Sequence, residues 1–113
     1  MEVLKTALSG VPLLKVIGDI DHLTAPSLEA LVQQALGVDG AHLLLDLSDC
    51  PYVDSGGLSV LLFACRQVRD EGWLGVIAPH PNLVRLFEIV GLTSVRGFRI
   101  FSSSEEALLA LEG

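Results

Sequence analysis

A run of leucines near the middle of the chain constrains the possible folds more than any other feature. Residues 42–48 read His-Leu-Leu-Leu-Asp-Leu-Ser, so apolar side chains occupy adjacent positions instead of alternate ones. Neighbouring side chains of a strand point to opposite faces of its sheet, and a nearly continuous apolar strand is typical of a sheet covered on both faces. The run therefore predicts a buried strand in a layered structure.

Patterns typical of strands and helices alternate on both sides of this run. The predicted strands lie at residues 3–8, 11–17, 42–48, 73–78 and 98–101. The first two are joined by Ser9-Gly10, a short turn that favours an antiparallel hairpin.

Helices are predicted where apolar residues recur three and four positions apart. Thr24 is the expected N-cap of the first helix, and Pro26 suits its first turn. The second helix is expected over residues 56–69 and the third over residues 81–90. The apolar face of the second helix is formed by Leu58, Leu61, Leu62, Cys65 and Val68, and that of the third by Leu83, Leu86, Phe87 and Val90. Each of these segments presents one apolar stripe, which we expect to be buried against the sheet.

The predicted order is β-β-α-β-α-β-α-β-α, which indicates the α/β class. The last helix begins at one of two possible capping boxes, Ser102-x-x-Glu105 or Ser103-x-x-Glu106. Strands joined through helices run parallel, with right-handed crossovers, so we expect a mostly parallel five-stranded sheet with one antiparallel edge strand and about four helices. A chain of 113 residues has room for one such domain, which we expect to span residues 1–113.

Charge and hydropathy exclude several classes of function. The net charge is −7 with only seven Lys and Arg residues, which argues against direct contact with nucleic acid. The longest apolar stretch, residues 58–65, is far shorter than the roughly 18 residues of a membrane span. Residues 1–5 lack the basic and apolar regions of a signal peptide. We therefore expect a cytoplasmic protein that is not inserted into a membrane.

Neither the cysteines nor the histidines have the spacing of a metal site. Cys50 and Cys65 are the only cysteines and form no Cys-x-x-Cys pair, and no His-Glu-x-x-His pattern occurs. Two buried, reduced thiols are the expected state in the cytoplasm. The sequence predicts no metal and no cofactor.

The run Asp54-Ser55-Gly56-Gly57-Leu58, which joins the third strand to the second helix, is the strongest candidate for a functional site. Backbone N–H groups in the first turn of a helix lack partners and the helix dipole is positive there, so a phosphate attached to Ser55 could be held. The two glycines leave the hydroxyl accessible to the active site of another protein. The ordinary alternative is that Ser55 is only an N-cap, since serine is favoured at that position.

Acidic groups are expected to gather around this serine. In parallel sheets, functional groups collect at the carboxyl ends of the strands. Five acidic residues leave the second and third predicted strands at that end: Asp19, Asp21, Asp46, Asp49 and Asp54. If these strands are neighbours, the carboxylates and Ser55 lie along one edge of the sheet.

The site does not match known enzyme motifs. Asp-Ser-Gly-Gly also surrounds the nucleophile of chymotrypsin-like proteases, but Val53 and Leu58 stand where that family has Gly and Pro. Val53 also occupies the first glycine position of a Gly-x-Ser-x-Gly elbow. A phospho-aspartate receiver on Asp46 or Asp54 would need a Lys at the end of the fifth strand, and there is none. The chain has three histidines, His22, His42 and His80, and none of them lies in a protease motif. No enzymatic activity is predicted.

The element order and three sequence runs resemble the STAS domain, and more narrowly the stand-alone bacterial anti-sigma factor antagonists. The runs are Gly-Asp-Ile-Asp-His-Leu-Thr-Ala at 18–25, Asp-Ser-Gly-Gly-Leu at 54–58, and the segment from Leu-Val-Arg-Leu-Phe at 83–87 to Val-Gly-Leu at 90–92. The resemblance covers essentially the whole chain. It implies a partner switch, in which the unphosphorylated antagonist binds an anti-sigma factor that is a serine kinase and releases the sigma factor.

The resemblance also implies roles for particular residues. Ser55 matches the serine that the kinase phosphorylates to end binding, and a metal-dependent phosphatase of the PP2C type would reset it. The residues expected at the partner surface are Asp21, His22, Thr24, Asp54, Gly56 and Gly57. Gly56 departs from the family, because many members have Ser or Thr there. The alternative within the same fold is a scaffold subunit of a signalling or lipid-transport complex that is not phosphorylated; the oligomeric state stays open.

Overall fold

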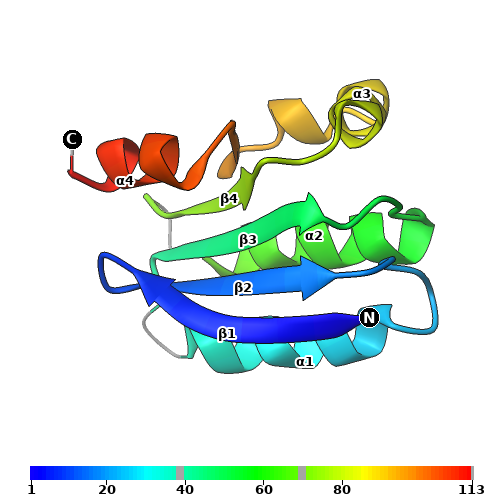
Figure 1. Cartoon of the computed structure of the whole chain (residues 1–113), viewed down its shortest axis with the longest axis horizontal. Coiled ribbons are helices and arrows are strands. Elements are labelled where there is room, and N and C mark those ends of the chain that lie inside the picture. The colour runs from blue at the N-terminus through cyan, green and yellow to red at the C-terminus, as the bar shows by residue number, and fades with distance from the viewer. Residues whose placement is uncertain (38–39, 69–70, 113) are drawn as a thin grey trace.

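The five strands lie side by side in the order in which they occur along the chain (Figure 1). The computed structural model describes residues 1–37, 40–68 and 71–112. The strands are β1 (Glu2–Leu8), β2 (Val11–Ile17), β3 (His42–Asp49), β4 (Trp73–Ile77) and β5 (Phe98–Phe101). The helices are α1 (Ala25–Leu36), α2 (Ser55–Gln67), α3 (Pro81–Ile89), the 3-10 helix η1 (Leu92–Ser94) and α4 (Ser104–Glu112). Apart from η1, this is the predicted order of elements.

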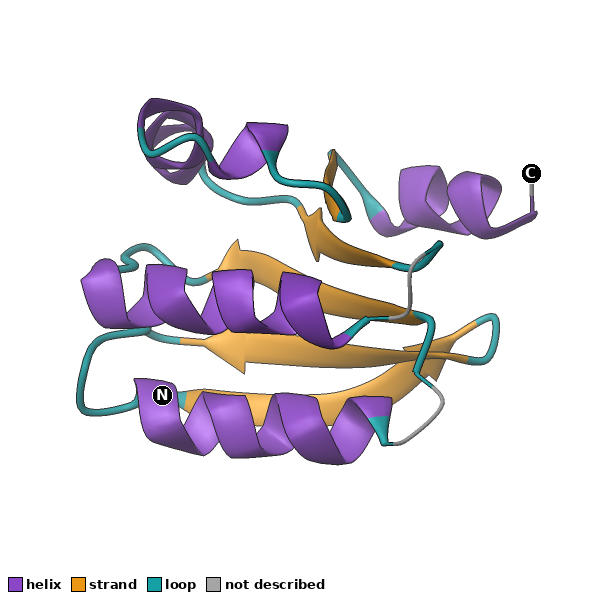
Figure 2. Cartoon of the chain, turned by 180° about the vertical axis from the view of Figure 1, so that it is seen from behind, coloured by secondary structure: helices purple, strands orange, loops and turns teal. Residues whose placement is uncertain are grey.

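The strand order decides which helices share a face of the sheet. β1 is antiparallel to β2, and β2 to β5 are parallel, as expected. Because each parallel strand is added on the same side of the one before it, right-handed crossovers place the connecting helices on one face. Figure 2 shows α1 and α2 lying side by side across that face.

The hydrophobic core is divided between the two faces of the sheet. Leu43, Leu45 and Leu47 of β3 point into the larger cluster, which also contains buried residues of α1, α2 and α3. Leu44 points the other way, into a smaller cluster with Ala107 of α4. The prediction that β3 is buried on both sides is therefore confirmed, and it explains the adjacent leucines.

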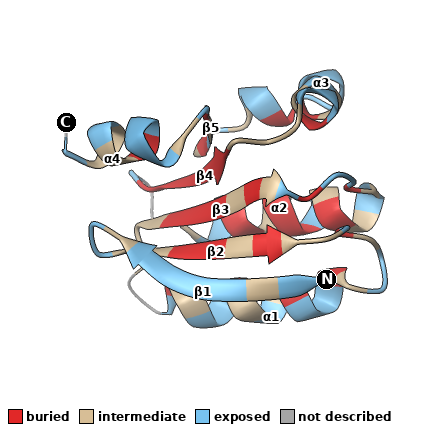
Figure 3. Ribbon diagram, viewed as in Figure 1, coloured by how far each residue is buried: buried red, intermediate tan, exposed pale blue. Residues whose placement is uncertain are grey.

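The second face is covered at only one end of the sheet. α4 packs over β4 and β5, while β1 is mostly exposed (Figure 3). Leu4 of β1 keeps 48% of its surface exposed. Asp46 and Ser48 of β3 are only half-buried, so the polar positions of the predicted strand lie beyond the cover that α4 provides.

Several boundaries differ from those predicted by small amounts. β3 extends to Asp49, and β4 ends at Ile77 because Ala78 has a positive φ of 50°. α2 begins one residue earlier than expected and is described to Gln67; its predicted end at Arg69 lies outside the described residues.

Of the two candidate capping boxes, Ser103-x-x-Glu106 marks the start of α4. The Glu106 N–H donates to Ser103 Oγ at 3.1 Å, while the Glu106 carboxylate accepts from the Ser102 hydroxyl at 2.6 Å.

Within the described residues, no helix has the length and apolar character needed to cross a membrane.

Gly75, in the middle of β4, is expected to be essential for packing of the second face. A Cβ atom there would lie 2.6 Å from Phe101, 2.7 Å from Trp73 and 2.8 Å from Leu44. We predict that Gly75→Ala lowers the free energy of unfolding by about 1–3 kcal/mol, because overpacking outweighs the smaller entropic gain of replacing glycine. Urea denaturation measures the change. Ala7→Val, which adds bulk at an exposed position of β1, serves as the control and should change stability by less than about 0.5 kcal/mol; equal stability of Gly75→Ala would contradict the prediction.

Candidate functional site

Pairing between β2 and β3 continues beyond the ends of both strands. The Gly18 N–H donates to the Asp49 carbonyl at 3.0 Å, and the Ile20 N–H donates to the Tyr52 carbonyl at 3.0 Å. The Asp54 N–H then donates back to the Ile20 carbonyl at 3.1 Å, and Ile20 forms a parallel bridge with Val53. The segment 18–24 and the segment 50–54 are therefore held side by side where α2 begins.

Asp54, not Ser55, is the N-cap of α2. Its carboxylate Oδ1 accepts hydrogen bonds from the N–H groups of Gly56 at 2.8 Å and Gly57 at 3.1 Å. Its backbone is extended, with φ −97° and ψ −169°, as is usual for an N-cap. Ser55 is the first residue of the helix, so the interpretation of Ser55 as an ordinary N-cap is wrong.

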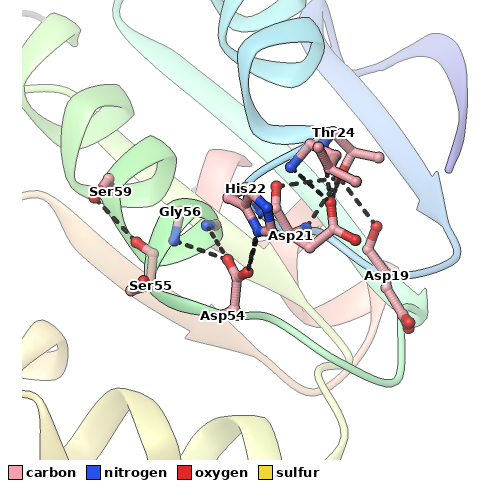
Figure 4. A network of polar contacts seen from close by, with 10 residues as sticks. Asp19, Asp21, His22, Thr24, Asp54, Ser55, Gly56 and Ser59 are labelled. Carbon is pink, nitrogen blue, oxygen red and sulfur yellow. Dashed lines mark hydrogen bonds and ion pairs between the residues drawn. The ribbon is translucent and has the colours of Figure 1, made fainter.

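The second oxygen of the same carboxylate binds the neighbouring segment. Asp54 Oδ2 accepts the His22 N–H at 3.0 Å and lies 3.6 Å from His22 Nδ1 (Figure 4). Burial raises the pKa of Asp54, but the N–H groups of Gly57, His22 and Gly56 together outweigh it and hold the pKa below its ordinary value. The carboxylate is therefore ionised at neutral pH.

Asp21 and Thr24 stabilise the loop that carries His22. Asp21 Oδ1 accepts the N–H groups of Leu23 and Thr24, each at 2.9 Å, and Thr24 Oγ1 accepts the Asp21 N–H at 2.9 Å. The Thr24 N–H is the main reason why the pKa of Asp21 is lowered, with further contributions from the Leu23 N–H and the Thr24 hydroxyl. Thr24 stands at the N-cap position of α1, as expected, but its hydroxyl bonds backward to Asp21 and makes no capping hydrogen bond.

The two glycines after Ser55 allow close contact between backbone segments. A Cβ on Gly56 would lie 2.9 Å from His22 Cα, and one on Gly57 would lie 2.6 Å from a methyl group of Val53 and 2.9 Å from one of Ile20. Contacts this short leave no room for a side chain. Gly56 and Gly57 thus bring the start of α2 against the 18–24 segment, in addition to leaving Ser55 accessible.

Ser55 itself is exposed, and its hydroxyl makes no hydrogen bond within the described residues. Only its backbone carbonyl is engaged, accepting the Ser59 hydroxyl at 3.0 Å. No imidazole is hydrogen-bonded to this hydroxyl within the same residues, since His22 pairs with Asp54 and His80 lies 3.0 Å from the Ser48 carbonyl. The arrangement provides an accessible acceptor hydroxyl without the general base of a serine hydrolase.

The expected acidic edge is only partly assembled around Ser55. Asp21 and Asp54 belong to the bonded network next to it, and the Asp19 carbonyl joins them through the Thr24 hydroxyl at 3.3 Å. Asp49 instead lies 3.3 Å from Lys15, and Asp46 accepts the Ser48 N–H within its own strand.

Two exposed apolar residues near the site were not predicted. Leu23 is 77% exposed and Tyr52 is 53% exposed, and they lie on the two segments that meet at Asp54. Leu23 lies within the run 18–25 and Tyr52 lies two residues before Asp54, but neither belongs to a periodic apolar pattern, so periodicity gives no signal for their exposure.

A shallow apolar pocket lies beside α2, between it and the segment that follows α3. Leu58 and Leu62, which we expected on the buried face of the helix, are only half-buried and line this pocket. Val90, expected on the apolar stripe of α3, lies past the end of that helix and is 51% exposed.

Metal binding would need a group of ligand side chains, and thiol chemistry would need a reactive cysteine. The described residues contain no group of three or more His, Cys, Asp or Glu side chains that could hold a metal ion. Cys50 and Cys65 are buried, and burial raises both thiol pKa values, that of Cys65 to about 11. Neither thiol is a nucleophile at neutral pH, because the thiolate is the reactive form.

Comparison with known proteins identifies the family to which this chain belongs. The STAS domain model matches residues 2–107. An anti-sigma-F factor antagonist of Mycobacterium tuberculosis is 30% identical over 105 residues, covering 93% of this chain and 84% of the relative. An anti-sigma-B factor antagonist of Listeria monocytogenes is 35% identical over 81 residues, 71% of each chain.

Similarity in three dimensions extends over nearly the whole chain. The crystal structure of an anti-sigma factor antagonist from Mycobacterium paratuberculosis has a TM-score of 0.87 at 28% identity, covering 99% of this chain and 94% of that one. With the sequence matches, this shows that the chain belongs to the STAS domain family, among the non-enzymatic regulators known as anti-sigma factor antagonists.

Proposed function

We propose that this chain binds an anti-sigma factor that is a serine kinase, and that phosphorylation of Ser55 by this kinase ends the binding. While bound, the unphosphorylated chain keeps the anti-sigma factor from its sigma factor. A phosphatase of the PP2C type restores the unphosphorylated form. The observation that carries the proposal is the exposed Ser55 hydroxyl at the first residue of α2, free of hydrogen bonds within the described residues.

The charges around Ser55 favour an electrostatic switch. A phosphoserine carries about −1.5 to −2 charges and three acceptor oxygens. It would stand next to Asp54 and near Asp21, whose lowered pKa values keep both carboxylates ionised. Since Asp54 caps α2, the helix start stays formed when Ser55 is modified. Typical coupling energies between a modification and the binding of a partner correspond to an affinity that is about 5- to 150-fold weaker after the modification.

The proposed partner surface combines charge with apolar contacts. It consists of Asp21, His22, Leu23, Tyr52 and Ser55, together with the exposed side of α2. Leu23 and Tyr52 offer apolar area that binding would remove from water. Asp54, Gly56 and Gly57 lie beneath this surface, where their contacts are made within the chain. A partner with basic groups and an apolar patch fits these features.

Phosphorylation at Ser55 is the first test. Incubating the protein with ATP and each candidate serine-kinase anti-sigma factor from the same genome, followed by mass spectrometry, should place one phosphate on Ser55. Ser55→Ala should abolish labelling and change the unfolding free energy by no more than about 0.5 kcal/mol, because Ser55 is not the cap. Ser59→Ala, which removes the neighbouring hydroxyl, should keep the phosphate on Ser55. Labelling that persists in Ser55→Ala would contradict the assignment.

Asp21→Lys should weaken binding to the anti-sigma factor mainly through a slower association rate that depends on salt, as is usual for charges at the periphery of an interface. Surface plasmon resonance at two salt concentrations measures this. Asp21→Asn is the matched variant, because it removes the charge yet keeps an oxygen that can accept the Leu23 and Thr24 N–H groups. Glu112→Lys, at the far end of α4, makes the same change in net charge and should bind like the wild type. Unchanged association of Asp21→Lys at low salt would place the interface elsewhere.

Ser55→Asp should be an incomplete mimic of the phosphorylated form. Aspartate has one charge and two oxygens, whereas the phosphate has nearly two charges and three oxygens. At the first residue of α2 its carboxylate is also stabilised by the helix dipole, so the fold should tolerate it. Its affinity for the anti-sigma factor, measured by calorimetry, should fall between those of the unmodified and phosphorylated proteins. Ser55→Asn separates size from charge and should bind more tightly than Ser55→Asp; equal affinity of all forms would rule out charge at this helix start as the switch.

A further inference from the structure

The Asp54 carboxylate is committed to contacts within the chain. Oδ1 accepts the N–H groups at the start of α2, from Gly56 and Gly57, and Oδ2 accepts the His22 N–H from a segment 32 residues earlier. The side chain is 19% exposed, against 77% for His22. One carboxylate thus joins the helix that carries Ser55 to the loop that carries Asp21.

We propose that Asp54 is a positioning residue, which sets the spacing between the Ser55 hydroxyl and the loop 21–24, and that the kinase recognises this spacing. The proposal rests on the proposed function, because it concerns the same phosphorylation. It differs from the expectation that Asp54 contacts the partner directly, since both of its oxygens are hydrogen-bonded inside the chain.

Gly56 provides a second, independent observation of the same spacing. The position of a Cβ on Gly56 is 2.9 Å from His22 Cα and 3.2 Å from His22 N, so the obstacle is backbone and not the end of a flexible side chain. The loop therefore rests directly on the start of α2. The absence of a side chain on Gly56 allows this contact with His22, and the hydrogen bond from the His22 N–H to the Asp54 carboxylate stabilises it.

The spacing matters because of the reaction that Ser55 would undergo. The Ser55 oxygen attacks the γ-phosphorus of ATP held by the kinase, the bond to ADP breaks, and the hydroxyl proton passes to a base of the kinase. Such a transfer needs the oxygen aligned with the leaving group, and a misplacement of about 1 Å can lower the rate by about 100-fold. If the kinase binds Asp21, the Ser55 oxygen is aligned with ATP only when Asp21 and Ser55 are held at a fixed distance from each other.

Asp54→Asn separates the two tasks of the carboxylate. Asparagine is a good N-cap but has a single acceptor oxygen, so it can serve α2 or the loop and not both. Hydrogen exchange followed by NMR should show faster exchange, by about tenfold, of the His22 amide or of the Gly56 and Gly57 amides, as expected for loss of a charge-assisted hydrogen bond. Gln33→Ala on the exposed side of α1 is the control and should leave all three unchanged. Wild-type protection of all three amides in Asp54→Asn would overturn the proposal.

A double-mutant cycle with the kinase identified by Ser55 labelling tests the link to recognition. Asp21→Asn should raise KM and leave kcat nearly unchanged, whereas Asp54→Asn should lower kcat. In the double variant the loss in kcat/KM should be smaller than the product of the single losses by more than about threefold, because independent sites agree with the product within about a factor of two. A purely structural role for Asp54 would give the simple product and overturn the proposal.

Gly56→Ala provides a variant that keeps the carboxylate intact. It should displace the loop and lower kcat for phosphorylation while the protein remains folded by circular dichroism. Phosphorylation of folded Gly56→Ala at the wild-type rate would also overturn the proposal. A wild-type protein that no candidate kinase labels would instead contradict the proposed function, and hydrogen exchange would still decide whether Asp54 holds the loop.

Discussion

The burial of β3 on both faces is the constraint on which the rest of the structure depends. Leu43, Leu45 and Leu47 face α1 and α2, while Leu44 faces the cluster under α4. β3 also pairs with β2 on one side and β4 on the other, so its position is fixed in every direction. The chain that leaves β3 continues along Ile20, and in this way the parallel pairing reaches Val53 and Asp54. The place where α2 begins is thus a consequence of the sheet.

Asp54 caps α2, and Ser55, the first residue of the helix, leaves its hydroxyl exposed. Either residue type could cap the helix. A serine that capped α2 would lose its capping bond on phosphorylation, and the first turn would have to rearrange. With Asp54 as the cap, the Ser55 hydroxyl makes no hydrogen bond that the fold needs within the described residues. The proposed phosphorylation would therefore leave the cap of α2 in place, because the neighbouring residue provides it.

The parts of this structure that depend on local patterns could be predicted, and those that depend on distant contacts could not. Element order follows from periodicity within each segment, and the adjacent leucines of β3 correctly indicated burial on both sides. The choice of Asp54 over Ser55 as the cap was not predicted, because both residue types are favoured at that position, and the His22 N–H that binds the second oxygen of Asp54 comes from a distant segment. Likewise, the apolar stripe containing Leu58 and Leu62 was predicted, but these two side chains are only half-buried. Periodicity indicates the direction of a side chain and not whether another segment covers it.

In the proposed switch, the surface around Ser55 would separate affinity from regulation. Leu23 and Tyr52 present apolar area that would contribute to binding with or without a phosphate on Ser55. The electrostatic part of the interaction, which would involve Asp21, Asp54 and the phosphate, would differ between the two forms. That part is screened within about 8–10 Å at physiological salt, so the ratio of the two affinities depends on how near the partner's charged groups come to Ser55. Under this proposal, the apolar contacts would set how tightly the partner binds, while the position of one helix start would set how strongly phosphorylation opposes binding.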